Sequence, residues 1–352
     1  MIVPGDPGQR TGGYLFDAHM VQQLRRQGWS VRVTGLDGRF PDGDERALEA
    51  MHKALAAEPD NARVVIDGLA LGAVPEAVED HARRLDISAL VHHPLADETG
   101  HDAATRRRLL EREKRALAAC RRVLVTSPFT ARRLGELGLC RHSPRVVEPG
   151  VERAELAGPV GVRLAGREPD GPERLLCVAS LTPRKGQDLL VEALAGLADR
   201  PWHCVLAGST GRDPEFAAGV SRAIQSAGLG ERIECVGECH AEALEAEYRR
   251  AGVCVLASHY EGYGMVVTEA LARGLPVITT TGGALADTAP EACCLKAAPG
   301  DPDALRTALA RWLDEPELRT RLTRNAAARR DSLGDWQDAG YAFADALLEA
   351  SP

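Results

Sequence analysis

The sequence predicts an α/β fold made of two doubly wound, Rossmann-like domains. Apolar strand-like runs alternate with amphipathic helical stretches, and this alternation occurs twice along the 352 residues. The length exceeds that of a typical single core and suits two units of about 150 to 180 residues each. Residues 156–173 are rich in glycine, proline and charge and lack a clean period, which is typical of a linker. We therefore expect domains at 1–155 and 174–333, with a substrate cleft between them.

The predicted strands of the first domain are short apolar runs followed by helical patterns. Apart from Met1, only Ile2 and Val3 precede the first glycine-rich loop, so we expect either a short first strand or a start that lies further upstream. A final amphipathic helix at 336–348, within the segment 334–352, is expected to cross back to this domain. The strands are predicted at 2–3, 31–33, 64–66, 89–91, 123–125 and 146–147.

The second domain shows clearer strands, because several of its apolar runs are continuous and bounded by turn residues. Such runs are typical of strands that helices cover on both faces. The strands are predicted at 175–179, 204–207, 233–236, 253–257 and 277–279.

Composition excludes several classes of protein. Hydrophobic residues make up 44% and charged residues 27%, which indicates a soluble globular chain. The net charge of −8 argues against nucleic-acid binding, which usually leaves a basic surface. No apolar run approaches the roughly 18 residues of a membrane span, and the amino terminus lacks a signal pattern. We therefore expect a cytoplasmic protein. The nine cysteines show no zinc-type spacing, so we expect neither a disulfide scaffold nor a structural metal.

The most informative segment is 258–270 (SHYEGYGMVVTEA), which follows the apolar run 253–257. Glu261 falls in the loop at the carboxyl end of this strand, where open α/β sheets bind ligands. A helix is predicted from Gly264 to about Arg273, and the free amides at its start suit a diphosphate. The spacing of Glu261 and Glu269 alone would favour two solvated glutamates. The surrounding glycines and the strand-to-helix context favour a ligand site instead.

This segment resembles the E-x7-E signature of retaining glycosyltransferases with two facing Rossmann-like domains (the GT-B type), and most closely the family-4 type. Residues 270–278 (ALARGLPVI) resemble the usual continuation in that family. The resemblance covers nearly the whole chain and is strongest at 175–283. It implies that Glu261 contacts hydroxyls of the donor sugar and that Glu269 holds the ribose. The donor-binding residues that it implies here are Glu261, Gly262, Gly264, Met265, Val266 and Glu269. The backbone amides of Gly264, Met265 and Val266 would face the diphosphate.

The segment 175–188 (LLCVASLTPRKGQD) resembles the donor-phosphate loop of the same family. A nucleotide sugar leaves a charged diphosphate, and an enzyme without a metal needs fixed cations there, which Arg184 and Lys185 can provide. An exposed pair of loop charges is the alternative. Lysine is scarce in this chain, so finding one beside Arg184 at the end of a strand favours the functional interpretation.

The first domain opens with a glycine-rich loop at 4–13 (PGDPGQRTGG). Glycines at a strand-to-helix turn let the backbone approach a ligand closely. By resemblance, Gly12 and Gly13 lie against the donor diphosphate and the acceptor. A dinucleotide-binding loop is not indicated, because the sequence contains no G-x-G-x-x-G.

Two adjacent histidines follow the strand at 89–91. The family carries a histidine here that contacts the donor sugar near the reacting carbon, and we assign it to His93, with His92 as the competitor. Alternation along a strand sends the two side chains to opposite sides, so we expect only one of them in the cleft. A buried histidine bonded to a backbone carbonyl is the alternative for either.

Two acidic features need separate interpretation. The sequence Asp42-Gly43-Asp44 matches a D-x-D metal motif in letters only, and we expect Asp44 to cap a helix. Asp287, in the segment 282–287, stands where the family often has a glutamate, so this helix start departs from the family pattern by a shorter side chain.

The sequence therefore predicts a metal-independent, retaining hexosyltransferase without a cofactor, acting on a UDP-type or GDP-type donor and a hydroxyl-bearing small molecule, glycan or lipid. Its catalytic residues would be His93, Arg184, Lys185 and Glu261. A nucleotide-sugar epimerase of the same fold and a non-catalytic nucleotide-sugar-binding protein stay open. The base, the sugar, the acceptor and the oligomeric state do not follow from the sequence.

Overall fold

The computed structural model describes residues 1–140 and 142–349, which form two compact units. Unit 1 contains residues 1–150 and the C-terminal residues from 334, and unit 2 contains 151–333. The segment 156–173 is not the open linker that its composition predicts. It contains helix α7 (Gly158–Leu164), and Ala157 and Val160 are buried in the core of unit 2. Glycine and proline at the start of α7 hid this short apolar face from the sequence pattern.

Within its described residues, unit 1 is built on six parallel strands in the order β2-β1-β3-β4-β5-β6. The short first strand is real, since Ile2 and Val3 are buried and β1 pairs with strands on both sides. The strands are β1 (Ile2–Pro4), β2 (Thr34–Leu36), β3 (Arg63–Asp67), β4 (Asp86–Val91), β5 (Arg122–Val125) and β6 (Arg145–Val146).

The position predicted for β2 was wrong by three residues. The apolar run 31–33 lies just before the strand, which begins at Thr34 because the register pairs Thr34 with Ile2 of β1. Only Leu36 of this edge strand is buried, so β2 lacks the apolar run by which a strand is recognised.

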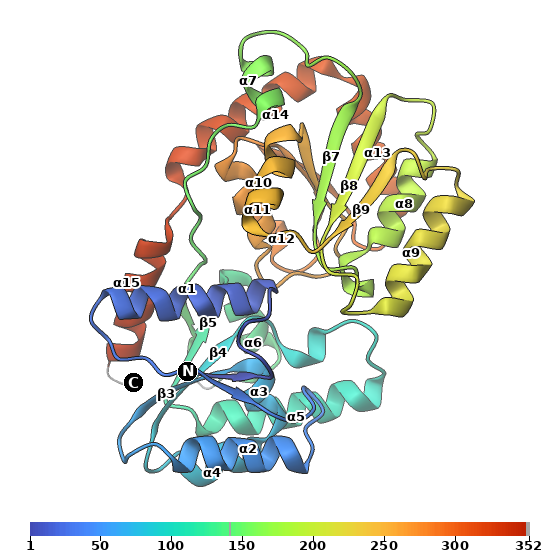
Figure 1. Cartoon of the computed structure of the whole chain (residues 1–352). Helices are drawn as coiled ribbons and strands as arrows, with labels where there is room; N and C mark the ends of the chain where they lie inside the picture. Colours follow the sequence, from blue (N-terminus) through green and yellow to red (C-terminus); the bar gives the residue numbers. More distant parts are fainter. Residues whose placement is uncertain (141, 350–352) are drawn as a thin grey trace. The chain divides into compact units, whose positions relative to one another are not determined.

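The helices of unit 1 flank its sheet on both faces, and Figure 1 shows α1 and α15 on one face and α2, α4 and α5 on the other. Phe16 of α1 packs edge-on against Trp336 and Phe343 of α15. Asp44 caps α2 as expected, because its carboxylate accepts a hydrogen bond from the Ala47 amide at 2.9 Å. The helices are α1 (Gly12–Arg26), α2 (Glu45–Ala56), α3 (Gly68–Ala73), α4 (Pro75–His81), α5 (Ala103–Ala119), α6 (Pro128–Glu136) and α15 (Trp336–Leu348).

Unit 2 also contains six parallel strands within its described residues, in the order β12-β11-β10-β7-β8-β9. The sequence did not predict β12, an edge strand in which the partly exposed Lys296 interrupts the apolar pattern. The strands are β7 (Glu173–Val178), β8 (Trp202–Ala207), β9 (Ile233–Gly237), β10 (Val253–Leu256), β11 (Val277–Thr280) and β12 (Cys294–Ala297).

Helices cover both faces of this sheet too, so the predicted α/β class with two helix-flanked parallel sheets is confirmed. Among the described residues, no helix combines the length and apolar character needed to span a membrane. The helices that follow α7 are α8 (Gln187–Ala195), α9 (Pro214–Ser226), α10 (Ala241–Arg250), α11 (Met265–Ala272), α12 (Leu285–Thr288), α13 (Pro302–Asp314) and α14 (Pro316–Arg329).

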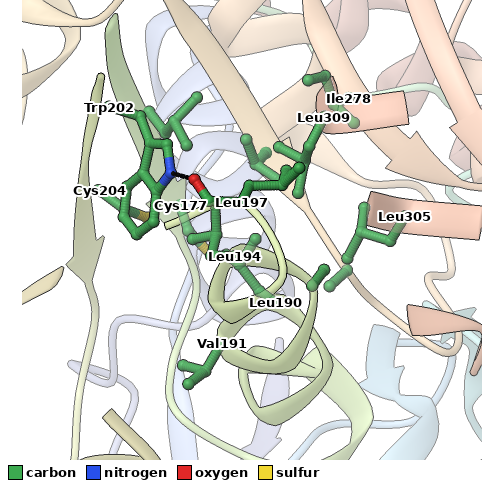
Figure 2. Close-up of a cluster of buried hydrophobic side chains, with 14 of the residues drawn as sticks. Cys177, Leu190, Val191, Leu194, Leu197, Trp202, Cys204, Ile278, Leu305 and Leu309 are labelled. Carbon is green, nitrogen blue, oxygen red and sulfur yellow. Dashed lines mark hydrogen bonds between the residues drawn. The ribbon is translucent and has the colours of Figure 1, made fainter. Parts of the chain in front are cut away.

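One face of the unit 2 sheet is closed by a large apolar cluster, shown in Figure 2. Leu190 and Leu194 of α8 and Leu309 of α13 are fully buried there against the strands. Trp202 of β8 is also buried, and its ring nitrogen donates a hydrogen bond to the Leu197 carbonyl at 2.7 Å. This packing fixes α8, and therefore the turn that precedes it at the end of β7.

Candidate functional site

The order of strands places a switch point between β7 and β10 of unit 2. From β7 the chain proceeds to β8 on one side, while β10 pairs with β7 on the other. Ligands of open α/β sheets bind at the carboxyl ends of such strands. The 3₁₀ turn Pro183–Lys185 follows β7, and the loop that carries Glu261 follows β10.

These two loops are joined by backbone contacts. The His259 amide donates to the Arg184 carbonyl at 2.8 Å. Gly186 ends the turn with φ of +64°, and a Cβ at this position would lie 2.3 Å from the Ala257 carbonyl oxygen. Glycine is therefore required here, because it allows the turn after β7 to lie directly on the end of β10.

Glu261 is the centre of a buried polar cluster. Its side chain accepts hydrogen bonds from Lys185 Nζ at 2.5 Å and from Arg184 Nη1 at 3.2 Å. Ser258, which is fully buried, donates from its hydroxyl to Oε1 at 2.7 Å. Glu261 itself is 7% exposed. The structure thus brings together the three unit 2 residues that the sequence singles out as catalytic.

The electrostatics of this cluster favour a carboxylate. Burial opposes ionisation of Glu261, but Lys185 and Arg184 outweigh it and lower the pKa of the carboxyl to about 2. Burial lowers the pKa of Lys185, and the Glu261 charge counteracts that effect. Because the pKa of Glu261 is depressed, its contribution to stability is present above about pH 4.5 and is lost as the pH falls toward 2.

The loop 261–264 is anchored at both ends. Glu261 forms a parallel bridge with Gly283, and the Ala284 amide donates to the Glu261 carbonyl at 2.8 Å. Gly264 adopts a left-handed conformation with φ of +88° and precedes α11, which begins at Met265. The amides of Met265 and Val266 lie in the first turn, where backbone donors have no intrahelical partner. Gly262 lies between these anchors and is partly exposed.

Glu269 lies one turn further along α11 and has a partner that the sequence did not indicate. The hydroxyl of the buried Tyr248 donates to Glu269 Oε2 at 2.9 Å. The Arg273 guanidinium stacks over the Tyr248 ring at 4.2 Å and donates to the Glu269 carbonyl at 2.8 Å. The pKa of Glu269 is raised above its ordinary value, because burial outweighs the opposing effects of the Tyr248 hydrogen bond and the Arg273 charge.

In unit 1, the predicted glycines begin a helix at the carboxyl edge of the sheet. Gly12 and Gly13 are the first residues of α1, which follows the loop after β1. A Cβ on Gly13 would lie 3.1 Å from Cδ2 of His92. Gly13 and His92 are therefore in close contact, although they lie 79 positions apart in the sequence.

The two histidines have different surroundings, as strand alternation predicts. His92 Nε2 lies 3.2 Å from Asp17 Oδ1 and 3.4 Å from Asp67 Oδ2. His93 Nε2 instead lies 3.2 Å from Glu98 Oε2. Within unit 1 it is His92, and not the assigned His93, that lies against the glycine turn. The catalytic assignment of His93 stays a prediction.

Four polar residues beside the predicted ones were missed. Ser258 and Tyr248 bond to the two signature glutamates, and Asp17 and Asp67 surround His92. Ser258 could have been found from its place three residues before Glu261. The other three come from distant segments, and no local pattern marks them.

Comparisons with known proteins agree with this architecture. Residues 163–329 match the family model described as glycosyl transferases group 1. The chain is 30% identical over 259 residues to the D-inositol 3-phosphate glycosyltransferase of Kineococcus radiotolerans, covering 67% of this chain and 58% of that protein. It is 30% identical over 230 residues to the mannosylfructose-phosphate synthase of Agrobacterium fabrum, covering 62% and 50%. The chain thus spans less than two thirds of the length of these relatives.

Solved structures show the same fold over nearly the whole chain. The sucrose-phosphate synthase from Thermosynechococcus elongatus has a TM-score of 0.77 and 24% identity, with 98% of this chain and 97% of that chain covered. Anabaena Alr3699/HepE in complex with UDP and glucose has a TM-score of 0.74 and 17% identity, with 98% of each chain covered.

Proposed function

We propose that this chain, whose residues 163–329 match the family model of glycosyl transferases group 1, is a retaining glycosyltransferase. It moves a hexose-type sugar from a UDP-type or GDP-type donor to a hydroxyl-bearing acceptor in the cytoplasm. The observation that carries this proposal is the Glu261 carboxylate held by Lys185, Arg184 and Ser258 at the switch point of unit 2.

The charges of this cluster suit a nucleoside diphosphate. Lys185 and Arg184 carry two positive charges, and Glu261 neutralises one of them. The remaining positive charge, together with the free amides at the start of α11, supports binding of a diphosphate without a metal ion. Arg184 Nη1 also donates to the Tyr260 carbonyl at 2.8 Å, which fixes the direction of its guanidinium group.

Glu261 suits the sugar rather than acid-base chemistry. A carboxylate with a pKa of about 2 is a poor base at neutral pH, but it is a strong acceptor for sugar hydroxyls. In the proposed reaction, the acceptor attacks from the face that the diphosphate leaves, and a phosphate oxygen takes the acceptor's proton. The protein supplies orientation and charge stabilisation.

A panel of nucleoside diphosphates and nucleotide sugars should reveal the donor by thermal shift. A ligand at 100 times its dissociation constant stabilises the fold by about 2.7 kcal/mol. We expect stabilisation in the presence of EDTA by one base type as its diphosphate, and much less by the matching monophosphate. No shift with any diphosphate would contradict the proposal.

Product analysis with the identified donor then separates the enzymatic alternatives. Transfer requires an acceptor, whereas an epimerase would change the sugar of the donor without one. A donor that is bound but neither transferred nor slowly hydrolysed would indicate a non-catalytic binding protein. Mass spectrometry and NMR of the sugar products distinguish these outcomes.

Replacing Glu269 with alanine should mainly weaken binding of the nucleotide. If the carboxylate holds the ribose, its loss should cost the roughly 1.5–3 kcal/mol of charged hydrogen bonds. Calorimetry with the free nucleoside diphosphate measures this. Tyr248→Phe is the matched control, because it removes the internal partner of Glu269 and keeps the carboxylate. Equal losses in both variants would mean that Glu269 acts only through Tyr248.

A further inference from the structure

Three side chains from separate elements meet at the carboxyl edge of the unit 1 sheet. Asp17 lies in the second turn of α1, Asp67 is the last residue of β3, and His92 directly follows β4. Both carboxylates approach the same atom, Nε2 of His92, at 3.2 and 3.4 Å. Asp17 is 5% exposed and Asp67 is 7% exposed. Two buried anions therefore converge on one ring nitrogen.

This arrangement determines the state of the ring. A bare lone pair on Nε2 would be repelled by two carboxylate oxygens, whereas a proton on Nε2 can be accepted by both of them. Buried carboxylates are costly unless a positive charge compensates them, which favours a second proton on Nδ1. Asp17 and Asp67 are the charged groups that face His92 among the described residues.

The carboxylates and the ring are held in place by further contacts. Asp67 Oδ1 accepts a hydrogen bond from the Leu69 amide at 2.8 Å, which fixes its second oxygen toward His92. Phe16 packs edge-on against the imidazole, with the ring centres 5.7 Å apart. The Cδ2 edge of the ring lies against Gly13, where a Cβ would be 3.1 Å away. Nδ1 has no hydrogen-bond partner among the described residues, and 19% of the side chain is exposed.

We propose that Asp17 and Asp67 are positioning residues that keep His92 as an imidazolium against the Gly12–Gly13 turn. His92 then provides a fixed positive charge and an Nδ1–H donor to an oxygen of the nucleotide sugar, and it does not exchange protons during the reaction. This inference rests on the proposed function for its ligand. The charged state of His92 is independent of that function.

Electrostatics support this state. Burial opposes the charge on His92, but Asp17 and Asp67 outweigh it and raise the pKa of the ring to about 10. Burial also raises the pKa of Asp17, and the charge and hydrogen bond of His92 act against that shift. A raised histidine pKa stabilises the fold fully below about pH 6.5, and this contribution is lost as the pH rises through about 10.

The charged state can be measured by NMR on protein labelled with ¹⁵N in its ten histidines. We expect His92, identified by the loss of its signals in His92→Gln, to keep both nitrogens protonated up to about pH 9. Asp17→Asn and Asp67→Asn should each lower its midpoint by at least about one pH unit. Asp80→Asn is the matched control, since the Asp80 side chain is 70% exposed and faces His52 instead. A midpoint near 6.5 in the wild type, or one unchanged in both variants, would overturn the proposal.

A bound cation is the competing explanation of this cluster, because the same three atoms could ligate a metal. Dialysis against Mn²⁺ or Zn²⁺ tests it. Stoichiometric binding that Asp17→Asn abolishes would mean that a metal replaces the proton, which overturns the imidazolium. Absence of binding supports it. If Asp17→Asn does not fold, the NMR titrations of His92 in the wild type and in Asp67→Asn still test whether the ring is an imidazolium.

The ligand and the mechanism are tested on the same samples. A shift of the His92 Nδ1 signal with the bare nucleoside diphosphate identifies a phosphate oxygen, and a shift only with the intact donor identifies a sugar oxygen. In the Asp67→Asn enzyme we expect turnover to decline with rising pH at the new His92 midpoint, a limb that the wild type lacks. A wild-type His92 that stays charged in a protein that binds no nucleotide would refute the proposed function and leave the charge state intact.

Discussion

Lys185→Ala should lower turnover by about 10²–10³-fold, the loss expected when a charge that stabilises a leaving group is removed from a water-poor site. Lys185 Nζ is 2.5 Å from Glu261, and its side chain is only 19% exposed. Removing it leaves Arg184 as the remaining cation against Glu261, so the cluster loses the net positive charge that favours a diphosphate. Steady-state kinetics with the donor identified by thermal shift measures the effect.

Two controls separate this chemistry from a loss of structure. Lys114→Ala removes an exposed lysine from the surface of α5 and should leave turnover unchanged. The melting temperature of Lys185→Ala shows whether the cluster still folds. Activity within about threefold of the wild type would remove Lys185 from the site. A folded variant that binds the nucleoside diphosphate as tightly as the wild type would exclude its role at the phosphates.

The sequence predicts the fold best where strands are buried on both faces. All of β10 is buried, so its run of apolar residues reveals the strand without any tertiary information. Edge strands lack this property. In β2 only Leu36 is buried, and in β12 Lys296 is partly exposed, so neither has a pattern that separates it from a loop. Their positions are set by pairing with β1 and β11, which a local pattern cannot express.

The residues of the candidate site also differ in whether a local sequence pattern reveals them. Glu261, Arg184 and Lys185 each follow a recognisable strand, and adjacency of β7 and β10 brings them together. Asp17 gives no such signal, because a lone aspartate in an amphipathic helix usually faces water. Its burial depends on how α1 lies on the sheet, and its contact with His92 spans 75 positions. Tyr248 of α10 likewise reaches Glu269 of α11 across 21 positions, a contact that no local pattern marks.

The proposed role of Glu261 predicts that one variant loses sugar transfer without losing binding of the nucleoside diphosphate. Glu261→Gln keeps the shape of the side chain but removes the negative charge between Lys185 and Arg184. Both cations then lose the Glu261 carboxylate as an ion-pair partner, so the bare nucleoside diphosphate should bind as tightly as in the wild type or more tightly. Sugar transfer should fall by about 10²–10³-fold, because an amide accepts one hydrogen bond less from the sugar and leaves a hydroxyl mispaired.

Calorimetry with the nucleoside diphosphate and product formation measured with EDTA present give the two quantities separately. Ser258→Ala is the graded control, since it removes one hydrogen bond to Oε1 and keeps the charge. Its effect on transfer should correspond to only about 0.5–1.5 kcal/mol.

If Glu261→Gln transfers sugar as fast as the wild type, Glu261 does not hold the sugar. If it binds the diphosphate much more weakly, Glu261 holds the cations in place and does not compete with the phosphates for them. Loss of wild-type activity on adding EDTA alone would separately contradict a metal-independent reaction, because Lys185 and Arg184 would then be insufficient for the leaving group.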